Sequence, residues 1–324
     1  MKKKGLIILA VILTACIVLA VLYMTAGCGS INKTAAPVKT TLPASGRPES
    51  ETGPALPHTW LELPGKSESE ENDWHCITHN GLMEGRMQRN YTVLYDESEF
   101  ASYWVAYPLC SSHTTTGREE IWGYDPKVPQ EHQTSVRKGY GASTPTTNYP
   151  NNFYARGHQI PNADRNAVPQ MQEQTYYSTN MTPQIQNGFN GGIWAKLEEA
   201  VRETIPEKDT LYIVTGATFN RPGENKSVKT IINKNDGKTL PVPNYYWKAV
   251  LKVKRDPSGI ITDAITIGFW LPHDDLKGHT WEEYSVSVDQ LETFTGFDLF
   301  VNLCPEREET AEVNSSWSSF VNFR

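Results

Sequence analysis

Hydrophobic and polar positions along the chain predict several strands and two helices. Residues 91–95 alternate in polarity like a half-buried strand, and residues 99–107 form an aromatic and apolar run. Runs of β-branched and aromatic residues predict further strands at 211–215, 246–254 and 260–269. Trp194, Leu197 and Val201 follow helical spacing and predict a helix over 191–201, and residues 288–294 form a second candidate helix.

The order of these segments indicates the fold class. Strands and helices follow one another without a regular βαβ alternation, which favours an α+β fold. Residues 111–152 are polar and rich in Gly, Pro and Asn, so they predict a long loop region. Residues 66–72 predict a solvated loop, and no repeat or second linker follows them. We therefore expect one domain over residues 58–324.

The first 57 residues predict export and a tether. Lys2, Lys3 and Lys4 precede an apolar run over 5–27, and this run is long enough to span a bilayer. The small residues before Cys28 resemble a bacterial lipoprotein processing site, which makes residues 1–28 a signal with Cys28 as the lipidated residue. An uncleaved signal anchor is the alternative, and processing at Cys16 is disfavoured because it leaves an apolar stub. Residues 29–57 predict a flexible linker, and every version places the domain outside the cytoplasm, membrane-anchored at the bacterial cell envelope or secreted.

Charge and cysteine content narrow the function classes. A formal net charge of -7 argues against a binder with a broad basic surface, but an enzyme that meets phosphate through a few arginines is compatible with it. Outside the N-terminal segment the chain has Cys76, Cys110 and Cys304. An odd count in an oxidising compartment predicts at most one internal disulfide. Cys76 and Cys110 are the predicted pair because they lie in the same part of the chain.

The segment around His158 carries the chemistry. If Arg156 to His158 is extended, both side chains point to one side and converge on one substrate group. Gly157 between them permits a close approach of backbone or phosphate. An imidazole can take a proton from water near neutral pH, and a guanidinium can hold the growing charge of a phosphate. The pair therefore suits phosphodiester cleavage.

A second motif predicts a metal site. On a helix, Asn190, Trp194 and Glu198 follow an i, i+4, i+8 line. Asn190 and Glu198 are then about 12 Å apart along the axis, so Glu198 reaches a shared ion only through water. One amide oxygen and several waters suit Mg²⁺. Because Gly191 and Gly192 follow it, Asn190 is also a candidate helix cap.

These motifs resemble the DNA/RNA non-specific endonuclease family, which has a ββα-metal active site and includes secreted bacterial nucleases and mitochondrial endonuclease G. The matching segments are 156–158, 180–184 and 190–198, supported by 104–107, 214–216 and 246–248. The resemblance covers about residues 90–303, and the order and spacing of its motifs make it specific. It implies a central, mostly antiparallel sheet flanked by helices and long loops.

The resemblance also implies roles for individual residues. His158 resembles the general base that activates water, and Arg156 resembles the arginine that stabilises the transition-state phosphate. Asn190 resembles the single direct protein ligand of Mg²⁺, with Mn²⁺ also compatible, and Glu198 resembles the carboxylate that orients metal-bound water. Asn180 resembles an active-site asparagine that supports the arrangement. The implied substrates are DNA and RNA.

One further match is loose, and two points depart from the family pattern. Arg118, before residues 122–126, is the nearest candidate for a further arginine, at loose spacing. Ala155 stands where the family signature opens with aspartate, which removes neither base nor ligand. The segment from Asn180 to Asn190 is slightly longer than in some relatives, so Asn187 is a rival metal ligand.

Other readings carry less weight. His75, Cys76 and His79 offer metal-binding side chains without a second cluster, and residues 273–275 predict a polar loop. Trp194, Tyr246 and Trp247 are expected in the core. Besides the enzyme, two other classes are open: a catalytically inactive protein that binds nucleic acid at the cell surface, and an effector against neighbouring cells. The effector normally needs a delivery domain, and none is evident.

Overall fold

The computed structural model describes residues 60–65, 74–141 and 152–323. The predicted export segment (1–28), the linker (29–57) and the solvated loop (66–72) lie outside these described residues. Within the described ranges, no helix combines the length and the apolar character needed to cross a membrane.

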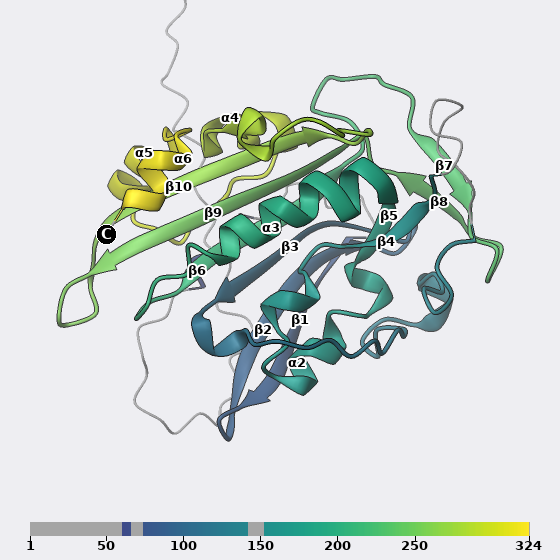
Figure 1. The fold of residues 1–324 in the computed structure, drawn as a ribbon, viewed down its shortest axis with the longest axis horizontal. Coiled ribbons are helices and arrows are strands. Elements are labelled where there is room, and N and C mark those ends of the chain that lie inside the picture. The colour runs from purple at the N-terminus through teal and green to yellow at the C-terminus, as the bar shows by residue number, and fades with distance from the viewer. Residues whose placement is uncertain (1–59, 66–73, 142–151, 324) are drawn as a thin grey trace, which may run out of the picture. The chain divides into compact units, whose positions relative to one another are not determined.

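A seven-stranded sheet in the order β1-β2-β3-β6-β9-β10-β11 forms the centre of the domain, and every neighbouring pair is antiparallel (Figure 1). The strands are β1 (Trp74–Met83), β2 (Arg86–Asp96), β3 (Ala101–Leu109), β6 (Leu211–Thr218), β9 (Tyr245–Arg255), β10 (Ile261–Pro272) and β11 (Ser285–Val286). The four predicted strands, at 91–95, 211–215, 246–254 and 260–269, are therefore confirmed, and the apolar run over 99–107 contains most of β3. The α+β class and the mostly antiparallel sheet are confirmed as well.

Side chains on both faces of the sheet are buried, because helices cover each face. In β3, Tyr107 points into one core and Trp104 into the other. The helix α3 (Ala195–Arg202) crosses the first face through Leu197 and Val201 (Figure 1). The helices α4 (Val288–Thr295) and α5 (Pro305–Glu312) pack on the second face. Nearly continuous apolar strands such as β6 follow from this double coverage.

The remaining elements lie beside this sheet. β4 (Tyr154–His158) and β5 (Met181–Ile185) form an antiparallel pair, which confirms the predicted extended backbone around His158. β7 (Lys229–Ile232) and β8 (Thr239–Val242) form a second pair. The short helices are α2 (Pro169–Gln174) and α6 (Trp317–Asn322), and the 3-10 turns are η1 (Ser111–His113), η2 (Gln130–His132), η3 (Asn162–Asp164), η4 (Ser178–Asn180) and η6 (Trp281–Tyr284). Residues 111–141 are otherwise irregular apart from isolated bridges, as predicted for this loop region.

The helix predicted over 191–201 is only partly regular. α3 begins at Ala195, and the preceding segment η5 (Gln186–Trp194) is π-type and irregular. Gly192, at φ -124° and ψ -110°, interrupts the helical backbone between Asn190 and Trp194. The predicted i, i+4, i+8 row was therefore wrong between Asn190 and Trp194, where the helix is interrupted. The cap prediction was also wrong, because Asn190 lies inside η5 and its side chain bonds to Gln186.

The predicted Cys76–Cys110 disulfide is wrong, since the two sulfurs are not bonded in the structure. Cys76 pairs with Leu94 of β2, and Leu94 pairs with Trp104 of β3. Cys110 lies beyond the far end of β3. Two strand spacings and six residues along a strand separate the sulfurs by about 20 Å, far beyond the reach of a disulfide.

Candidate active site

The β4–β5 pair positions His158. His158 is the last residue of β4 and lies opposite Met181 of β5. A Cβ atom added to Gly157 would come within 2.3 Å of the Gln184 side chain. Glycine at this position is therefore required by the packing of β5 beneath β4. We expected Gly157 to allow a close approach of backbone or phosphate, but the group that approaches it in the structure is the Gln184 side chain.

Arg118, Arg156 and His158 gather around two aromatic rings. The guanidinium carbon of Arg156 lies 3.5 Å from the centre of the Trp122 ring, and the His158 ring is 5.5 Å from the same indole. Tyr176 closes the other side, with its ring 5.4 Å from His158 and 5.9 Å from the Arg118 guanidinium. The predicted convergence of arginine and imidazole is thus present in the structure. We call these three basic residues the basic cluster.

The surroundings of His158 keep its ring neutral. Burial, followed by the charges of Arg118 and Arg156, lowers the pKa of His158 to about 3. A hydrogen bond to the backbone of Arg156 opposes this shift but does not overcome it. The Nε2 atom is buried and has no hydrogen-bond partner. Nε2 is therefore the ring nitrogen that is available to accept a proton.

Asn180 holds the chain directly after His158. Its side-chain oxygen accepts a hydrogen bond from the Ile160 backbone N–H at 3.0 Å. Its amide group donates to the carbonyl oxygens of Ile160 and Thr175 at 3.0 and 2.8 Å. Asn180 is fully buried, so it cannot touch a substrate. It is a positioning residue that fixes the turn following β4.

Asn190 and Asn187 differ in how they are held. The Nδ2 group of Asn190 donates to Gln186 Oε1 at 2.9 Å, which orients its half-buried amide and directs the amide oxygen elsewhere. Asn187 is exposed, and its backbone N–H and carbonyl are both bonded to the Asn152 side chain. The segment η5 contacts both β4 and β5, so Asn190 and His158 lie on neighbouring elements.

Glu198 belongs to a second charged group, on α3. Burial raises the pKa of Glu198, and the nearby Lys248 ammonium offsets part of that shift. Arg202 bonds Asp164 at 2.8 Å, and Asp164 also accepts a hydrogen bond from the Tyr107 hydroxyl at 2.9 Å. The structure describes no contact that joins this group directly to the basic cluster.

Two members of this group were missed by the sequence analysis. Arg202 continues the α3 row four residues after Glu198, so the spacing that led to Glu198 also indicated Arg202. Lys248 is buried on β9, and its ammonium lies 5.1 Å from the Trp194 ring centre. Its segment matched the family pattern, but only the fold shows that Lys248 faces Glu198.

Three other sets of residues from the sequence analysis do not take part in the candidate active site. His79 is buried and bonds Asp125 at 2.9 Å, whereas His75 lies near Glu97, so the predicted weak metal motif does not assemble. Both ring nitrogens of His273 are hydrogen-bonded, to Ile185 and Pro243, which gives it a structural role. Trp194, Tyr246 and Trp247 are in the core as predicted.

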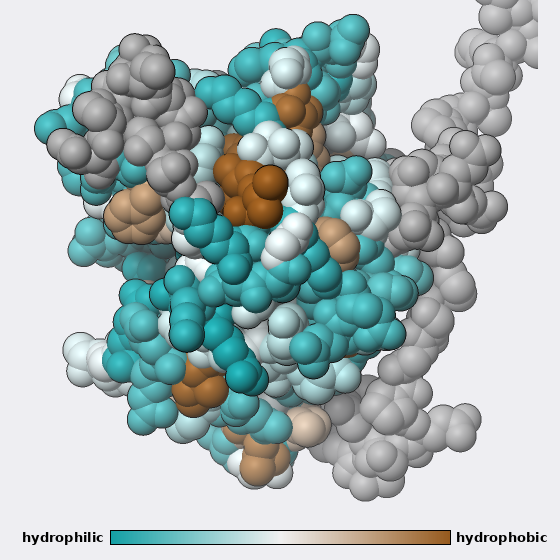
Figure 2. Space-filling view, turned by 90° about the vertical axis from the view of Figure 1, so that its right-hand side faces the viewer, coloured by the Kyte–Doolittle hydropathy of each residue, from teal (hydrophilic) through white to brown (hydrophobic). Residues whose placement is uncertain are grey.

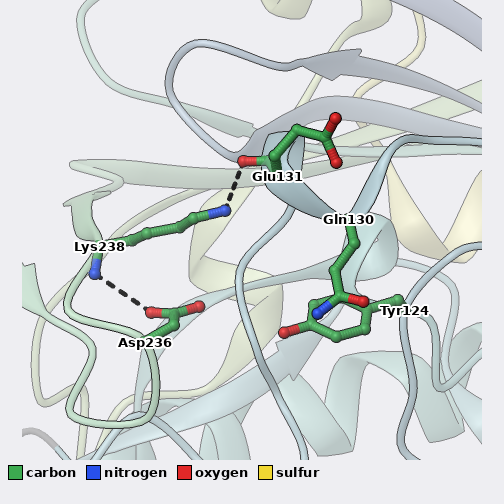
Figure 3. A pocket seen from close by; sticks show the side chains of 5 residues that line it. All are labelled: Tyr124, Gln130, Glu131, Asp236 and Lys238. Atoms are coloured by element: carbon green, nitrogen blue, oxygen red, sulfur yellow. Dashed lines mark hydrogen bonds between the residues drawn. The ribbon is translucent and has the colours of Figure 1, made fainter.

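A surface pocket of about 440 Å³ lies apart from the predicted site residues and is lined by Tyr124, Gln130, Glu131, Asp236 and Lys238 (Figure 3). Two of its charged groups, Lys238 and Asp236, are already hydrogen-bonded. The Lys238 ammonium donates to the carbonyl oxygens of Glu131 and Gln133, and the Asp236 carboxylate accepts from Thr134 and Ser135. The pocket contains none of the predicted site residues. The side of the domain with β7 and β8 is mainly hydrophilic, with small separate hydrophobic areas (Figure 2).

Comparison with known proteins identifies the family. The family model described as DNA/RNA non-specific endonuclease matches residues 76–306. The chain belongs to the DNA/RNA non-specific endonuclease family. Members of this family are metal-dependent hydrolases of nucleic acids, so the chain is classed as an enzyme.

Individual relatives agree with this placement. A nuclease of Nostoc sp. is 29% identical over 232 residues, which are 70% of this chain and 76% of the relative. A nuclease of Serratia marcescens is 26% identical over 70% of this chain and 79% of the relative. A crystal structure of an EndoG/EndoGI complex shares the fold with a TM-score of 0.54 at 17% identity, covering 78% of this chain and 96% of that one.

The donors in the structure fit the divalent metal that this family uses. Asn190 of η5 offers one neutral oxygen whose orientation is set by Gln186, and Glu198 of α3, beyond the break at Gly192, offers a carboxylate. Such a sparse set of oxygen donors suits a cation that keeps most of its water. The donor types at Asn190 and Glu198 are therefore compatible with a hydrated divalent cation.

Proposed function

We propose that this chain is an extracytoplasmic, Mg²⁺-dependent endonuclease that hydrolyses phosphodiester bonds of DNA and RNA with little sequence preference. The observation that carries the proposal is the placement of His158, whose Nε2 atom has no hydrogen-bond partner, beside Arg118 and Arg156. Its Nε2 atom has an unused lone pair, and Arg118 and Arg156 supply positive charge next to it.

The residues of the basic cluster divide the work of the reaction. His158 Nε2 takes a proton from the attacking water, which makes the oxygen a better nucleophile. Arg156 and Arg118 hold the phosphate and stabilise its negative charge as that charge builds in the transition state. The ring of Trp122 keeps the Arg156 guanidinium in place by a cation–π contact.

Asn190 and Glu198 are the residues that would hold the metal, Asn190 directly and Glu198 through water. When bound, Mg²⁺ supplies positive charge that favours departure of the leaving oxygen, and Mn²⁺ is expected to substitute for it. Asn180 contributes by fixing the chain after His158 rather than by touching the substrate.

Broad specificity follows from the kind of contact. The basic cluster addresses phosphate, and phosphate contacts carry no sequence information. The domain is assigned outside the cytoplasm because residues 1–28 predict an export signal that ends at Cys28 or remains as an anchor. Export keeps such an activity away from the genome of the producing cell.

One experiment tests the activity itself. Purified protein is incubated with circular DNA and with RNA, in Mg²⁺, in chelator, and in chelator followed by excess Mg²⁺. The proposal expects both substrates to be cut, chelator to stop cleavage, and Mg²⁺ to restore it. Binding of DNA without cleavage under all three conditions would instead support the inactive surface-binding protein.

A further inference from the structure

Helices α4 and α5 bring acidic side chains together outside the candidate active site. Asp289 and Glu292 are three residues apart on α4, and Glu308 and Glu312 are four apart on α5, so each pair lies on one face of its helix. Asp289, Glu292 and Glu312 each offer one carboxylate oxygen, and these three oxygens lie within 4.8 Å of one another. We call these three residues the acidic triad.

Glu312 points into this cluster from a buried position. Its side chain is only 5% exposed, and its Oε1 atom is buried without a hydrogen-bond partner. The backbone of α5 cannot relax outward here, because Thr266 of β10 donates a hydrogen bond to the Ala311 carbonyl at 2.9 Å. A buried carboxylate oxygen without a partner is costly unless a proton or a cation satisfies it.

The negative charges around Glu312 also favour a bound proton or cation. Burial, and then the neighbouring carboxylates of Glu292, Glu308, Asp289 and Asp298, raise the pKa of Glu312 to about 9. Burial and the nearby acidic groups also raise the pKa of Glu292 to about 7. So many carboxylates cannot all ionise together unless positive charge joins them.

We propose that the acidic triad binds one Ca²⁺ ion that links α4 to α5. Oxygen ligands lie 2.3–2.6 Å from Ca²⁺, so two ligands on opposite sides of the ion are about 5 Å apart. Three oxygens within 4.8 Å of one another are close enough to contact one such ion together. Mg²⁺ keeps several of its waters and is usually held by one or two carboxylates, so a set of three carboxylates favours Ca²⁺.

The remaining coordination positions are also available. Glu292 uses Oε1 to accept the Leu299 backbone N–H at 2.7 Å, which leaves Oε2 for a cation. Asp289 is exposed, so water can complete the shell from its side. Glu312 lies beyond residue 306, where the match to the family model ends. The helices α4 and α5 pack in one core of the sheet and α3 in the other, so the proposed ion is distinct from the proposed catalytic metal at Asn190.

The test is calcium-dependent stability of the full chain after removal of divalent cations. Thermal unfolding and calorimetric titration are measured with CaCl₂ for the wild type, Glu312→Gln and Asp289→Asn. We expect saturating Ca²⁺ to raise the unfolding temperature of the wild type by about 5 °C. Each variant should weaken Ca²⁺ binding by at least about tenfold. Asp289→Asn changes only an exposed side chain, so it reports on the site even if Glu312→Gln folds poorly.

Two controls separate this ion from other causes. Glu309→Gln changes an exposed carboxylate on α5 outside the triad and should keep the full calcium effect. Asn190→Ala alters the proposed catalytic metal site and should also keep it. The proposal is overturned if the wild type shows no calcium-dependent shift up to about 10 mM CaCl₂, far above the range of extracellular calcium modules. It is equally overturned if both triad variants retain wild-type affinity, or if Asn190→Ala abolishes the effect.

Discussion

The guanidinium carbon of Arg156 lies 3.5 Å from the centre of the Trp122 ring, and that indole also packs against His158. A residue of the long irregular loop thus contacts both candidate catalytic side chains of β4. Arg156 is further held by a hydrogen bond of 2.8 Å to the Val136 carbonyl, which belongs to the same loop region. The loop therefore builds one wall of the basic cluster.

This contact predicts a graded effect at Trp122. Trp122→Ala removes the ring that positions Arg156, and a cation–π contact is worth about 1 kcal/mol, so kcat/KM should fall roughly fivefold or more. Trp122→Phe keeps an aromatic face and should lose less. Steady-state cleavage of DNA by both variants measures the difference. Equal activity of Trp122→Ala and the wild type would show that the stacking does not position Arg156 for catalysis.

Asn180→Ala should destabilise the domain. The substitution leaves three buried backbone groups, at Ile160 and Thr175, without their partners. Unsatisfied buried groups cost about 1–3 kcal/mol each, so the free energy of unfolding should fall by at least about 2 kcal/mol in urea. Asn187→Ala, at an exposed side chain, is the matched control and should change stability by less than about 0.5 kcal/mol. Asn180→Ala with wild-type stability would contradict the positioning role.

The pKa of His158 can be followed directly by NMR of labelled histidine. An ordinary histidine ring takes up its proton as the pH falls through about 6.5. Burial and the charges of Arg118 and Arg156 lower the pKa of His158 to about 3, so its ring should stay neutral down to pH 5. Arg118→Met removes one positive charge and should raise this pKa, whereas Arg86→Met, at an exposed site on β2, should leave it unchanged. A His158 signal that titrates near pH 6.5 in the wild type would contradict this environment.

The metal ligand can be ranked by titration with Mg²⁺. Asn190→Ala removes the proposed direct ligand, so most activity should be lost even at high Mg²⁺. Glu198→Gln should lose less if Glu198 acts only through water, and Asn187→Ala should lose least because its side chain is exposed. Activity of the three variants across a Mg²⁺ series gives the ranking. If Asn187→Ala were inactive and Asn190→Ala active, the metal ligand would be Asn187 and the assignment of Asn190 would be wrong.

The sequence was sufficient where strands that are buried on both faces carry continuous runs of β-branched and aromatic residues. The strands β6, β9 and β10 were predicted for this reason, β2 was predicted from alternation over 91–95, and the candidate helix over 288–294 corresponds to α4. β1 was not predicted, because this edge strand over Trp74–Met83 mixes polar and apolar residues without clear alternation. The π-type segment before α3 also escaped prediction. Gly188, at φ 84°, packs so closely on Asp275 that no Cβ would fit, and this distant contact leaves no local signature.

In the candidate site too, local spacing could be predicted from the sequence, whereas contacts between distant segments could not. Arg156 and His158 are two residues apart on one strand, so their convergence could be read from spacing alone. Lys248 and the acidic triad could not be found that way, because their partners come from elements far apart in the sequence. The Cys76–Cys110 prediction failed for a related reason. The two cysteines are near each other in the sequence, but Cys76 aligns with Trp104 in the sheet and Cys110 lies beyond the C-terminal end of β3.

The most direct test of the account is DNA and RNA cleavage by His158→Ala under single-turnover conditions with saturating Mg²⁺. Loss of a general base commonly costs about 10²–10⁴-fold in rate. We expect a loss in this range on both substrates, with unchanged thermal unfolding and with binding of nucleic acid retained. His75→Ala, at a side chain that is 55% exposed on β1, is the matched control and should cleave like the wild type. A His158→Ala enzyme that cleaves within a few-fold of the wild type would contradict the assignment of His158 as the base.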